Sequence, residues 1–295
     1  MRMTCQMRCF LRGWRSVVSA IGRNMLIGCA LLALLLSGCH MPSPQPKPVL
    51  PRQQVAAGIT LEGHDVGGMD SAALTALLEQ LAQDREIRPQ NAFFDEGGDI
   101  RPGRSGTILA KRRTAFLVLT SPPGASLSAL WETAEPDITG RMLSQAAVLG
   151  AYATPILDNS PGRRQNMRLT AKLISNTIIT AGREFSFNTV VGEPTLARGF
   201  REAAIIGAGG RREQGIGGGM CQLSSTLYNA VLAGGLAVTE RHPHSRPVDY
   251  VPPDKDATTF TDKDFRFVNH TPEPVIIRAL VTNEQVIVDI RHLPQ

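Results

Sequence analysis

The chain has 295 residues, of which 42% are hydrophobic, and this is enough to fill the cores of two ordinary domains. Lys and Arg (31) exceed Asp and Glu (26) by five, and the first 38 residues contain five arginines and no other charged residue. The remainder therefore carries 31 − 5 = 26 positive charges against 26 negative ones, which excludes a nucleic-acid binder that depends on a standing excess of cations. The apolar content also excludes disorder along the whole chain.

The N-terminal segment has the pattern of a bacterial export signal. Five arginines precede the apolar run Met25–Leu36, which is shorter than the ~20 residues that span a bilayer. The run ends in Leu36–Cys39 (LSGC), which resembles a lipobox, the motif whose cysteine is acylated and becomes the new N-terminus. We expect residues 1–38 to be a lipoprotein signal peptide and Cys39 to anchor the protein by lipid to the membrane, outside the cytoplasm. A plain signal peptide or an uncleaved anchor is the alternative.

Residues 39–54 contain prolines at almost every second position, which favours an extended polyproline-II tether. After this tether the pattern predicts an α+β fold in two parts: a small α+β domain over 55–144, then a larger α+β domain over 145–295. In the larger domain we expect a central helix packed on a mostly antiparallel sheet.

The smaller domain contains one clear helix signal. Asp70 or Ser71 is a good N-cap, and four leucines follow at positions i, i+3, i+4 and i+7, on one helix face: Leu74, Leu77, Leu78 and Leu81. Short strands are expected at 59–62 and 92–95, and a buried strand at 115–120 (AFLVLT). No group of catalytic residues stands out here, so recognition or spacing is the expected role.

The larger domain has stronger patterns. We expect helices over 165–178 and 223–233, the second with a buried stripe of Leu223, Leu227, Ala230 and Val231, and a further helix over 141–149. A strand over 236–241 should follow the glycine pair that ends the second helix. The C-terminal segments 275–281 and 285–291 alternate as two strands of a hairpin.

The cysteine count singles out Cys221. Cys5, Cys9 and Cys29 lie in the predicted signal peptide and Cys39 is predicted to carry lipid, which leaves one thiol in the mature chain. An unpaired cysteine in an oxidising compartment is buried, bound to a metal or kept for its reactivity.

The residues around Cys221 favour a reactive thiol. Three glycines, Gly217, Gly218 and Gly219, precede it, and the helix pattern begins at or next to it, where unpaired N–H groups and the helix dipole stabilise a thiolate. The helix has more residues but rises only ~1.5 Å per residue, whereas the shorter strand that follows rises ~3.3 Å per residue. The two elements therefore have nearly the same length. If the strand folds back along the helix, His242 and His244 arrive level with the thiol.

A thiol enzyme is therefore one hypothesis, and its substrate in the cell envelope would be the amide bonds of peptidoglycan. In this enzyme Cys221 is the nucleophile, and His244 or His242 is the general base. Asp256 or Asn229 orients the base, and Gln222 with the Gly219 region donates hydrogen bonds to the oxyanion.

Two other hypotheses remain open. In the first, the protein binds peptidoglycan or a protein partner without catalysis, and Cys221 is a buried small residue in a tight turn. In the second, His242 and His244, on one face of a strand, join Cys221 as ligands of zinc. A fourth protein ligand is not apparent, so only an open zinc site would fit; we assign no residue as a metal ligand and no cofactor.

The same residues resemble a known family. The segments Phe185–Asn188, Gly217–Leu236 (GGGMCQLSSTLYNAVLAGGL) and Glu240–Thr258 are similar to the VanW family, named for an accessory protein of vancomycin-resistance clusters. The resemblance extends from about Thr154 to Val281, although Ala181 replaces a usual proline and the glycine usual before Asp256 is missing.

The resemblance implies a role in the cell envelope, with peptidoglycan or its precursors as partner, and the family supplies no settled reaction. Gly63–Met69 resembles part of the peptidoglycan-binding-like domain that often precedes VanW domains. As binding residues we select the three glycines before the thiol and three polar residues near them: Gly217, Gly218, Gly219, Arg164, Asn166 and Ser225.

Overall fold

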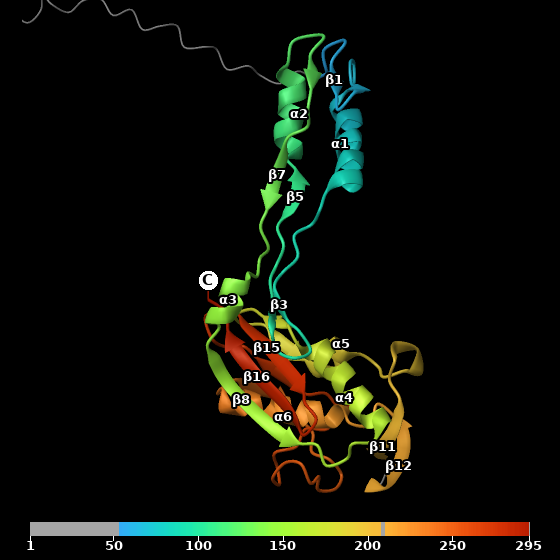
Figure 1. Ribbon diagram of the computed structural model, residues 1–295, viewed down its shortest axis with the longest axis vertical. Coiled ribbons are helices and arrows are strands. Elements are labelled where there is room, and N and C mark those ends of the chain that lie inside the picture. Colours follow the sequence, from blue (N-terminus) through green and yellow to red (C-terminus); the bar gives the residue numbers. More distant parts are fainter. Residues whose placement is uncertain (1–52, 208–209, 295) are drawn as a thin grey trace, which may run out of the picture. The chain divides into compact units, whose positions relative to one another are not determined.

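The computed structural model describes residues 53–207 and 210–294 (Figure 1). The predicted signal peptide, Cys39 and nearly all of the proline-rich tether lie outside these residues. The described residues form a mixed α+β fold, as predicted, with mostly antiparallel sheets. Their six α-helices are α1 (Ser71–Arg85), α2 (Lys111–Thr120), α3 (Gly140–Gln145), α4 (Pro161–Ile174), α5 (Phe187–Val191) and α6 (Met220–Ala233).

The N-terminal part of the described chain has its own apolar core. Strands β2 (His64–Asp65), β1 (Thr60–Leu61) and β6 (Ser126–Leu127) form one small sheet, and β5 (Gly106–Leu109) pairs with β7 (Trp131–Ala134). Helix α1 begins at the predicted cap, since the Asp70 carboxylate accepts the N–H of Ala73 at 2.8 Å. The core includes Ile59, Leu61, Val66, Leu74, Leu78, Leu81 and Val118.

The strand predicted over 115–120 is wrong, because these residues belong to α2. Thr114 and Val118, four residues apart, are fully buried, whereas Phe116 is 52% exposed. This is the period of a helix with one buried face. A run of five apolar residues and a threonine fits a buried strand and a helix equally well, so periodicity within the run does not decide between them.

A second small cluster joins residues that lie far apart in the described chain. Strands β3 (Phe93–Phe94) and β4 (Ile100–Arg101) form a hairpin, and Phe94 packs with Leu143 of α3, Ile276 and Leu293. The helix predicted over 141–149 is wrong in its second half: α3 ends at Gln145 and Val148 begins a strand. The domain boundary near residue 145 stays a prediction.

The largest core lies between a four-stranded antiparallel sheet and two helices (Figure 1). The strand order is β8 (Val148–Pro155), β16 (Gln285–His292), β15 (Val275–Val281) and β9 (Ile178–Ile179). Strands β15 and β16 form the predicted hairpin, and Val286, Val288 and Ile290 are buried as expected. Helix α6 packs on β8 and β16, while α4, which begins four residues earlier than predicted, packs on β15.

Helix α6 is the predicted central helix, and all four residues of its expected stripe are fully buried. Beyond α6, strands β10 (Glu184–Ser186), β14 (Arg266–Val268) and β13 (Ala237–Glu240) form a second sheet, and β11 (Glu202–Ile206) pairs with β12 (Arg212–Ile216). Strand β13 is the predicted return strand. Across the described ranges, none of the helices has the length and apolar character needed to cross a membrane.

Candidate functional site

Cys221 is the second residue of α6, directly after the glycine turn. The cap residue Gly219 has a φ of 108°, a conformation that side chains strongly disfavour, and Gly217 has a φ of 89°. The N–H groups of Gly218, Gly219 and Cys221 donate to no described residue. The turn therefore places unpaired donors and the positive end of the helix dipole next to the sulfur.

Asn166 of α4 holds this turn in place. Its Nδ2 donates to the carbonyl oxygens of Gly218 and Arg201, both at 2.9 Å, and its Oδ1 accepts the N–H of Arg201 at 2.8 Å. A Cβ atom at Gly218 would lie 2.6 Å from the Ala204 carbonyl oxygen, so the turn leaves no room for a side chain there. Asn166, Gly217, Gly218 and Gly219, predicted as binding residues, thus shape the turn that carries the thiol.

His244 and Asp256 form a buried ion pair beside the thiol. The Nδ1 atom of His244 lies 2.6 Å from Asp256 Oδ2, and the same oxygen accepts the backbone N–H of His244 at 2.6 Å. The second carboxylate oxygen, Oδ1, accepts from Arg241 Nη2 at 2.8 Å, and Arg241 Nε donates to the Asp256 carbonyl oxygen at 2.7 Å. Asp256 therefore fixes the orientation of the His244 ring, and Arg241 fixes Asp256.

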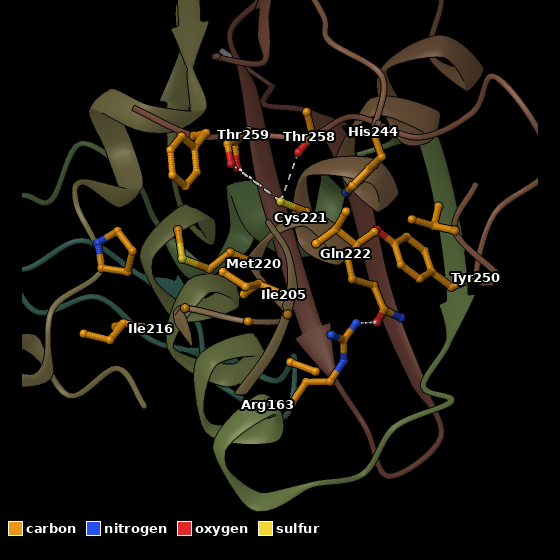
Figure 2. Close-up of a pocket in the computed structure, with 18 of the residues that line it drawn as sticks. Arg163, Ile205, Ile216, Met220, Cys221, Gln222, His244, Tyr250, Thr258 and Thr259 are labelled. Atoms are coloured by element: carbon orange, nitrogen blue, oxygen red, sulfur yellow. Dashed lines mark hydrogen bonds between the residues drawn. The ribbon is translucent and has the colours of Figure 1, made fainter. Parts of the chain in front are cut away.

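The sulfur of Cys221 is partly buried and surrounded by polar groups (Figure 2). Thr258 Oγ1 and the Thr259 carbonyl oxygen are each 3.6 Å away, and Thr259 Oγ1 is 3.9 Å away. Burial raises the pKa of the Cys221 thiol, but the hydrogen bond and positive charge of His244 lower it, with help from both threonines. The resulting pKa is about 7, below the ordinary 9.0.

The pKa values of His244 and Asp256 are shifted in the directions that favour the charged form of each side chain. Burial lowers the pKa of His244, but its hydrogen bond and attraction to Cys221, and then those to Asp256, raise it above the ordinary 6.5. Burial raises the pKa of Asp256, but the hydrogen bonds and charge of His244 and the charge of Arg241 lower it below 3.8. Near neutral pH these shifts favour a thiolate beside an imidazolium, the state in which a cysteine is a nucleophile.

The structure does not bring His242 to the thiol. Its Nε2 lies 2.9 Å from Glu240 Oε1, and its backbone carbonyl accepts the N–H of Thr258. Of the two predicted histidines, only His244 lines the cavity with Cys221 and lowers the pKa of its thiol. Asn229, the alternative orienting residue, is not near the imidazole either, since its Nδ2 donates to the carbonyl oxygens of Ser225 and Lys255.

Gln222 and Ser225 have structural partners. The Gln222 side chain is buried and donates from Nε2 to Thr154 Oγ1 at 3.1 Å and to the Pro155 carbonyl at 2.9 Å. Both of its amide hydrogens are therefore engaged, which leaves none for an oxyanion, in contrast to the expected role. Ser225 Oγ donates to the Cys221 carbonyl at 2.7 Å and accepts the N–H of Ala257 at 2.9 Å. Ser225 thus ties α6 to the segment that carries Asp256.

Arg164, another predicted binding residue, is directed elsewhere. Its guanidinium donates to Asn159 Oδ1 at 2.7 Å and to three oxygens of Thr282 and Asn283 in the β15–β16 turn. It fastens α4 to that turn and does not line the cavity next to Cys221. The neighbouring Arg163 does line it.

Cys221 and His244 open onto a cavity of about 590 Å³ (Figure 2). Its lining includes the glycine turn, Arg163, Gln222 and Tyr250, and exposed apolar side chains such as Leu157 (63%) and Phe260 (68%). Burial raises the pKa of Tyr250, and the nearby negative charge of Cys221 adds to the increase. A cavity of this size with apolar walls and a few convergent polar groups is typical of a small-molecule or peptide site.

The sequence patterns did not single out Thr258, Thr259 and Arg241. The threonines reach the sulfur because Thr258 pairs with His242 in an isolated antiparallel bridge. No local periodicity announces such a bridge. Asp256, two residues before Thr258, is marked in the sequence only as a carboxylate that follows the two histidines.

The three-ligand zinc arrangement is not assembled. His242 is directed to Glu240 and His244 to Asp256, and no group of three or more His, Cys, Asp or Glu side chains suited to a metal ion occurs in the part of the chain that the structure describes.

Comparison with known proteins places this site in a family. The family model for "VanW like protein" matches residues 162–291, which contain the glycine turn, Cys221, His244 and Asp256. The chain is also 36% identical over 217 residues to the uncharacterized protein YoaR of Bacillus subtilis (strain 168), covering 72% of this chain and 71% of YoaR. The chain belongs to the VanW-like family. The VanW-like region begins at residue 162, so the resemblance of the preceding part to a peptidoglycan-binding domain stays a prediction.

No solved structure matches this VanW-like chain. Neither the family description nor YoaR carries a stated activity.

Proposed function

We propose that this VanW-like protein is a thiol-dependent amide hydrolase or acyl transferase, with Cys221 as nucleophile, His244 as general base and acid, and Asp256 as the residue that orients His244. One observation carries the proposal: Cys221 and His244 line the same open cavity, and Asp256 holds the His244 ring at 2.6 Å. A nucleophile, a base within reach and a third group that holds the base is the general arrangement of covalent catalysis.

In the first step the Cys221 thiolate attacks the carbonyl carbon of an amide and a C–S bond forms. The carbonyl oxygen takes the negative charge, and the N–H groups of Gly218, Gly219 and Cys221 are the donors available to stabilise it. The C–N bond then breaks as the His244 imidazolium gives its proton to the leaving nitrogen. The products are a free amine and a thioester on Cys221.

In the second step water or an amine attacks the thioester carbonyl, and neutral His244 accepts the proton of the attacking group. The C–S bond breaks and returns the electron pair to sulfur, so the thiolate–imidazolium pair is restored. Asp256 stabilises the imidazolium at both stages, because its carboxylate is buried against the ring with Arg241 on its other oxygen.

Peptidoglycan is the substrate that fits the proposed location. The apolar run and the LSGC motif favour an exported protein that is lipid-anchored through Cys39, outside the cytoplasm. The amide bonds present there are those of the peptidoglycan peptides and their precursors. The balanced charge of residues 39–295 gives no support to a nucleic-acid partner.

The test is product analysis on purified peptidoglycan. Wild-type protein should release new amino groups or new cross-linked peptides, and Cys221→Ala should abolish both. His242→Ala is the matched control, since it removes an imidazole two residues from His244 that is bonded to Glu240. Products formed equally by wild type and Cys221→Ala would contradict the enzyme proposal. Cell fractionation of Cys39→Ala, which should lose its membrane association, tests the anchor.

A binding module without catalysis is the second candidate, favoured by the apolar residues at the cavity, such as Leu157 and Phe260. It predicts that Cys221→Ala binds purified peptidoglycan as well as wild type does while neither protein changes it.

A further inference from the structure

Among the described residues that line the cavity, Arg163 has a buried side-chain nitrogen without a hydrogen-bond partner. Its Nε atom is buried and has no hydrogen-bond partner among the described residues. Its Nη2 donates to Gln222 Oε1 at 3.0 Å. A guanidinium stays charged at every physiological pH, and a buried N–H of a charged group without an acceptor is costly.

The surroundings hold this guanidinium in a fixed place next to the nucleophile. Gln222, which accepts from it, is itself held by Thr154 and Pro155 and directly follows Cys221. The Arg163 stem packs against the glycine turn, so a Cβ at Gly219 would lie 3.1 Å from Arg163 Cγ. Figure 2 shows the Arg163 guanidinium joined to the side chain of Gln222, the residue next to Cys221. The position is therefore pre-organised.

The charged neighbours of Arg163 leave its Nε without an acceptor. Asp158 is the nearby carboxylate. Its pKa is lowered chiefly by the hydrogen bond from the Ser160 N–H, and further by the charges of Arg163 and Arg212. Its Oδ1 accepts that Ser160 N–H at 2.9 Å, and no ion pair joins Asp158 to Arg163 in the described ranges. Arg212, by contrast, faces Asp249 at 3.9 Å on the exposed surface.

From this geometry we infer that Arg163 is a carboxylate-binding residue, and that the substrates are peptides with a free carboxylate close to the amide bond that Cys221 attacks. The second part of this inference, that the carboxylate lies close to the amide bond attacked by Cys221, rests on the proposed thiol chemistry. Arg163 lines the cavity, and a carboxylate there would accept from two N–H groups of the guanidinium together, a geometry that lysine cannot reproduce. The carboxylate belongs to a peptide C-terminus or to an acidic side chain, and both present the same two oxygens.

The first experiment measures how fast Cys221 is alkylated by bromoacetyl-glycine and by its neutral amide, using full-length protein in detergent and mass spectrometry of the Cys221 peptide. The ratio of the alkylation rate with the acid to that with the amide should be about tenfold higher for wild type than for a free thiol. A charge-assisted hydrogen bond contributes about this much. Arg163→Gln should lose this preference while its rate with the amide is retained. Arg163→Lys should recover only part of it.

Arg212→Gln is the matched control, because it removes the same charge from another arginine at the cavity that is 73% exposed and faces Asp249. It should keep the preference for the acid. A preference that is equal in wild type and Arg163→Gln, or one that Arg212→Gln removes equally, would overturn the inference. Bromoacetyl-glutamate α-amide, compared with its glutamine counterpart, distinguishes an acidic side chain from a C-terminus.

The second experiment separates failure of this inference from failure of the proposed chemistry. Binding of acetyl-glycyl-glycine and of its amide is followed by ligand-observed NMR on the Cys221→Ala protein, where no thiol is present. Tighter binding of the acid that Arg163→Gln removes supports the carboxylate site even if Cys221 proves unreactive. Equal binding of acid and amide overturns it even if Cys221 is a strong nucleophile.

Discussion

The two histidines that follow β13 lie in contrasting surroundings, although only Pro243 separates them. The His242 side chain is 37% exposed and pairs with Glu240, itself 34% exposed, whereas the His244 side chain is 6% exposed and pairs with buried Asp256. Water and salt screen the first pair strongly and the second weakly. The difference shows that the same residue type becomes part of a candidate active site only where burial makes its charge interactions strong.

The largest effect should come from His244→Gln, which removes the imidazole beside the thiol. The pKa of Cys221 should rise from about 7 toward the ordinary 9.0, because burial then opposes ionisation without compensation by a positive charge. Thiolate forms only above the pKa, so the iodoacetamide rate at pH 7 should fall roughly tenfold, after allowance for the greater nucleophilicity of a more basic thiolate. The measurement is the labelling rate of the Cys221 peptide from pH 5 to 10. An unchanged midpoint would show that His244 does not act on the thiol.

Asp256→Asn should affect the pKa of the thiol less than His244→Gln does, because it leaves the imidazole in place and removes only the charge of its partner. We expect amide cleavage to fall by about 10²-fold or more, as for loss of effective acid–base catalysis. The free energy of unfolding at pH 6 should fall by about 1–3 kcal/mol, since His244 and Arg241 lose a buried charged acceptor.

The pH dependence of that stability loss has a definite sign. The pKa of Asp256 is lowered in the folded protein, so its contribution is present above the ordinary value of 3.8 and is lost as pH falls through the folded value. Urea unfolding of wild type and Asp256→Asn should therefore give a gap that shrinks between pH 6 and pH 2. A gap independent of pH would mean that the carboxylate charge contributes nothing.

His242→Gln should have the smallest effect. It breaks a half-exposed pair with Glu240, and such surface pairs contribute less than about 1 kcal/mol. The iodoacetamide midpoint of Cys221 should stay at about 7, and the urea midpoint should change little. If His242→Gln shifted the thiol midpoint as much as His244→Gln does, the contrast between the two histidines would be lost.

Much of the site's framework is local and was therefore predictable. The stripe Leu223, Leu227, Ala230 and Val231 has the period of a helix with one buried face, and the three glycines before it exclude regular structure. Together they place Cys221 at a helix N-terminus, as the structure has it. The β15–β16 hairpin was predictable for the same reason, because alternation along a strand depends on neighbouring residues alone.

Short apolar runs mark the limit of this reasoning. Ala115–Thr120 forms part of α2 because the surrounding core accepts Thr114 and Val118 from one face of a helix. The run itself is too short to express a period, so its packing partners decide its conformation.

By itself, the sequence determined the elements around Cys221, the family resemblance and the short set of side chains suited to thiol chemistry. Only the tertiary structure selected His244 over His242 and Asp256 over Asn229, brought Thr258 and Thr259 to the sulfur, and left Arg163 beside Gln222 with a buried N–H unpaired. The physical reason is that periodicity depends on neighbours along the chain, whereas burial, charge pairing and pKa depend on segments that meet only when the chain folds.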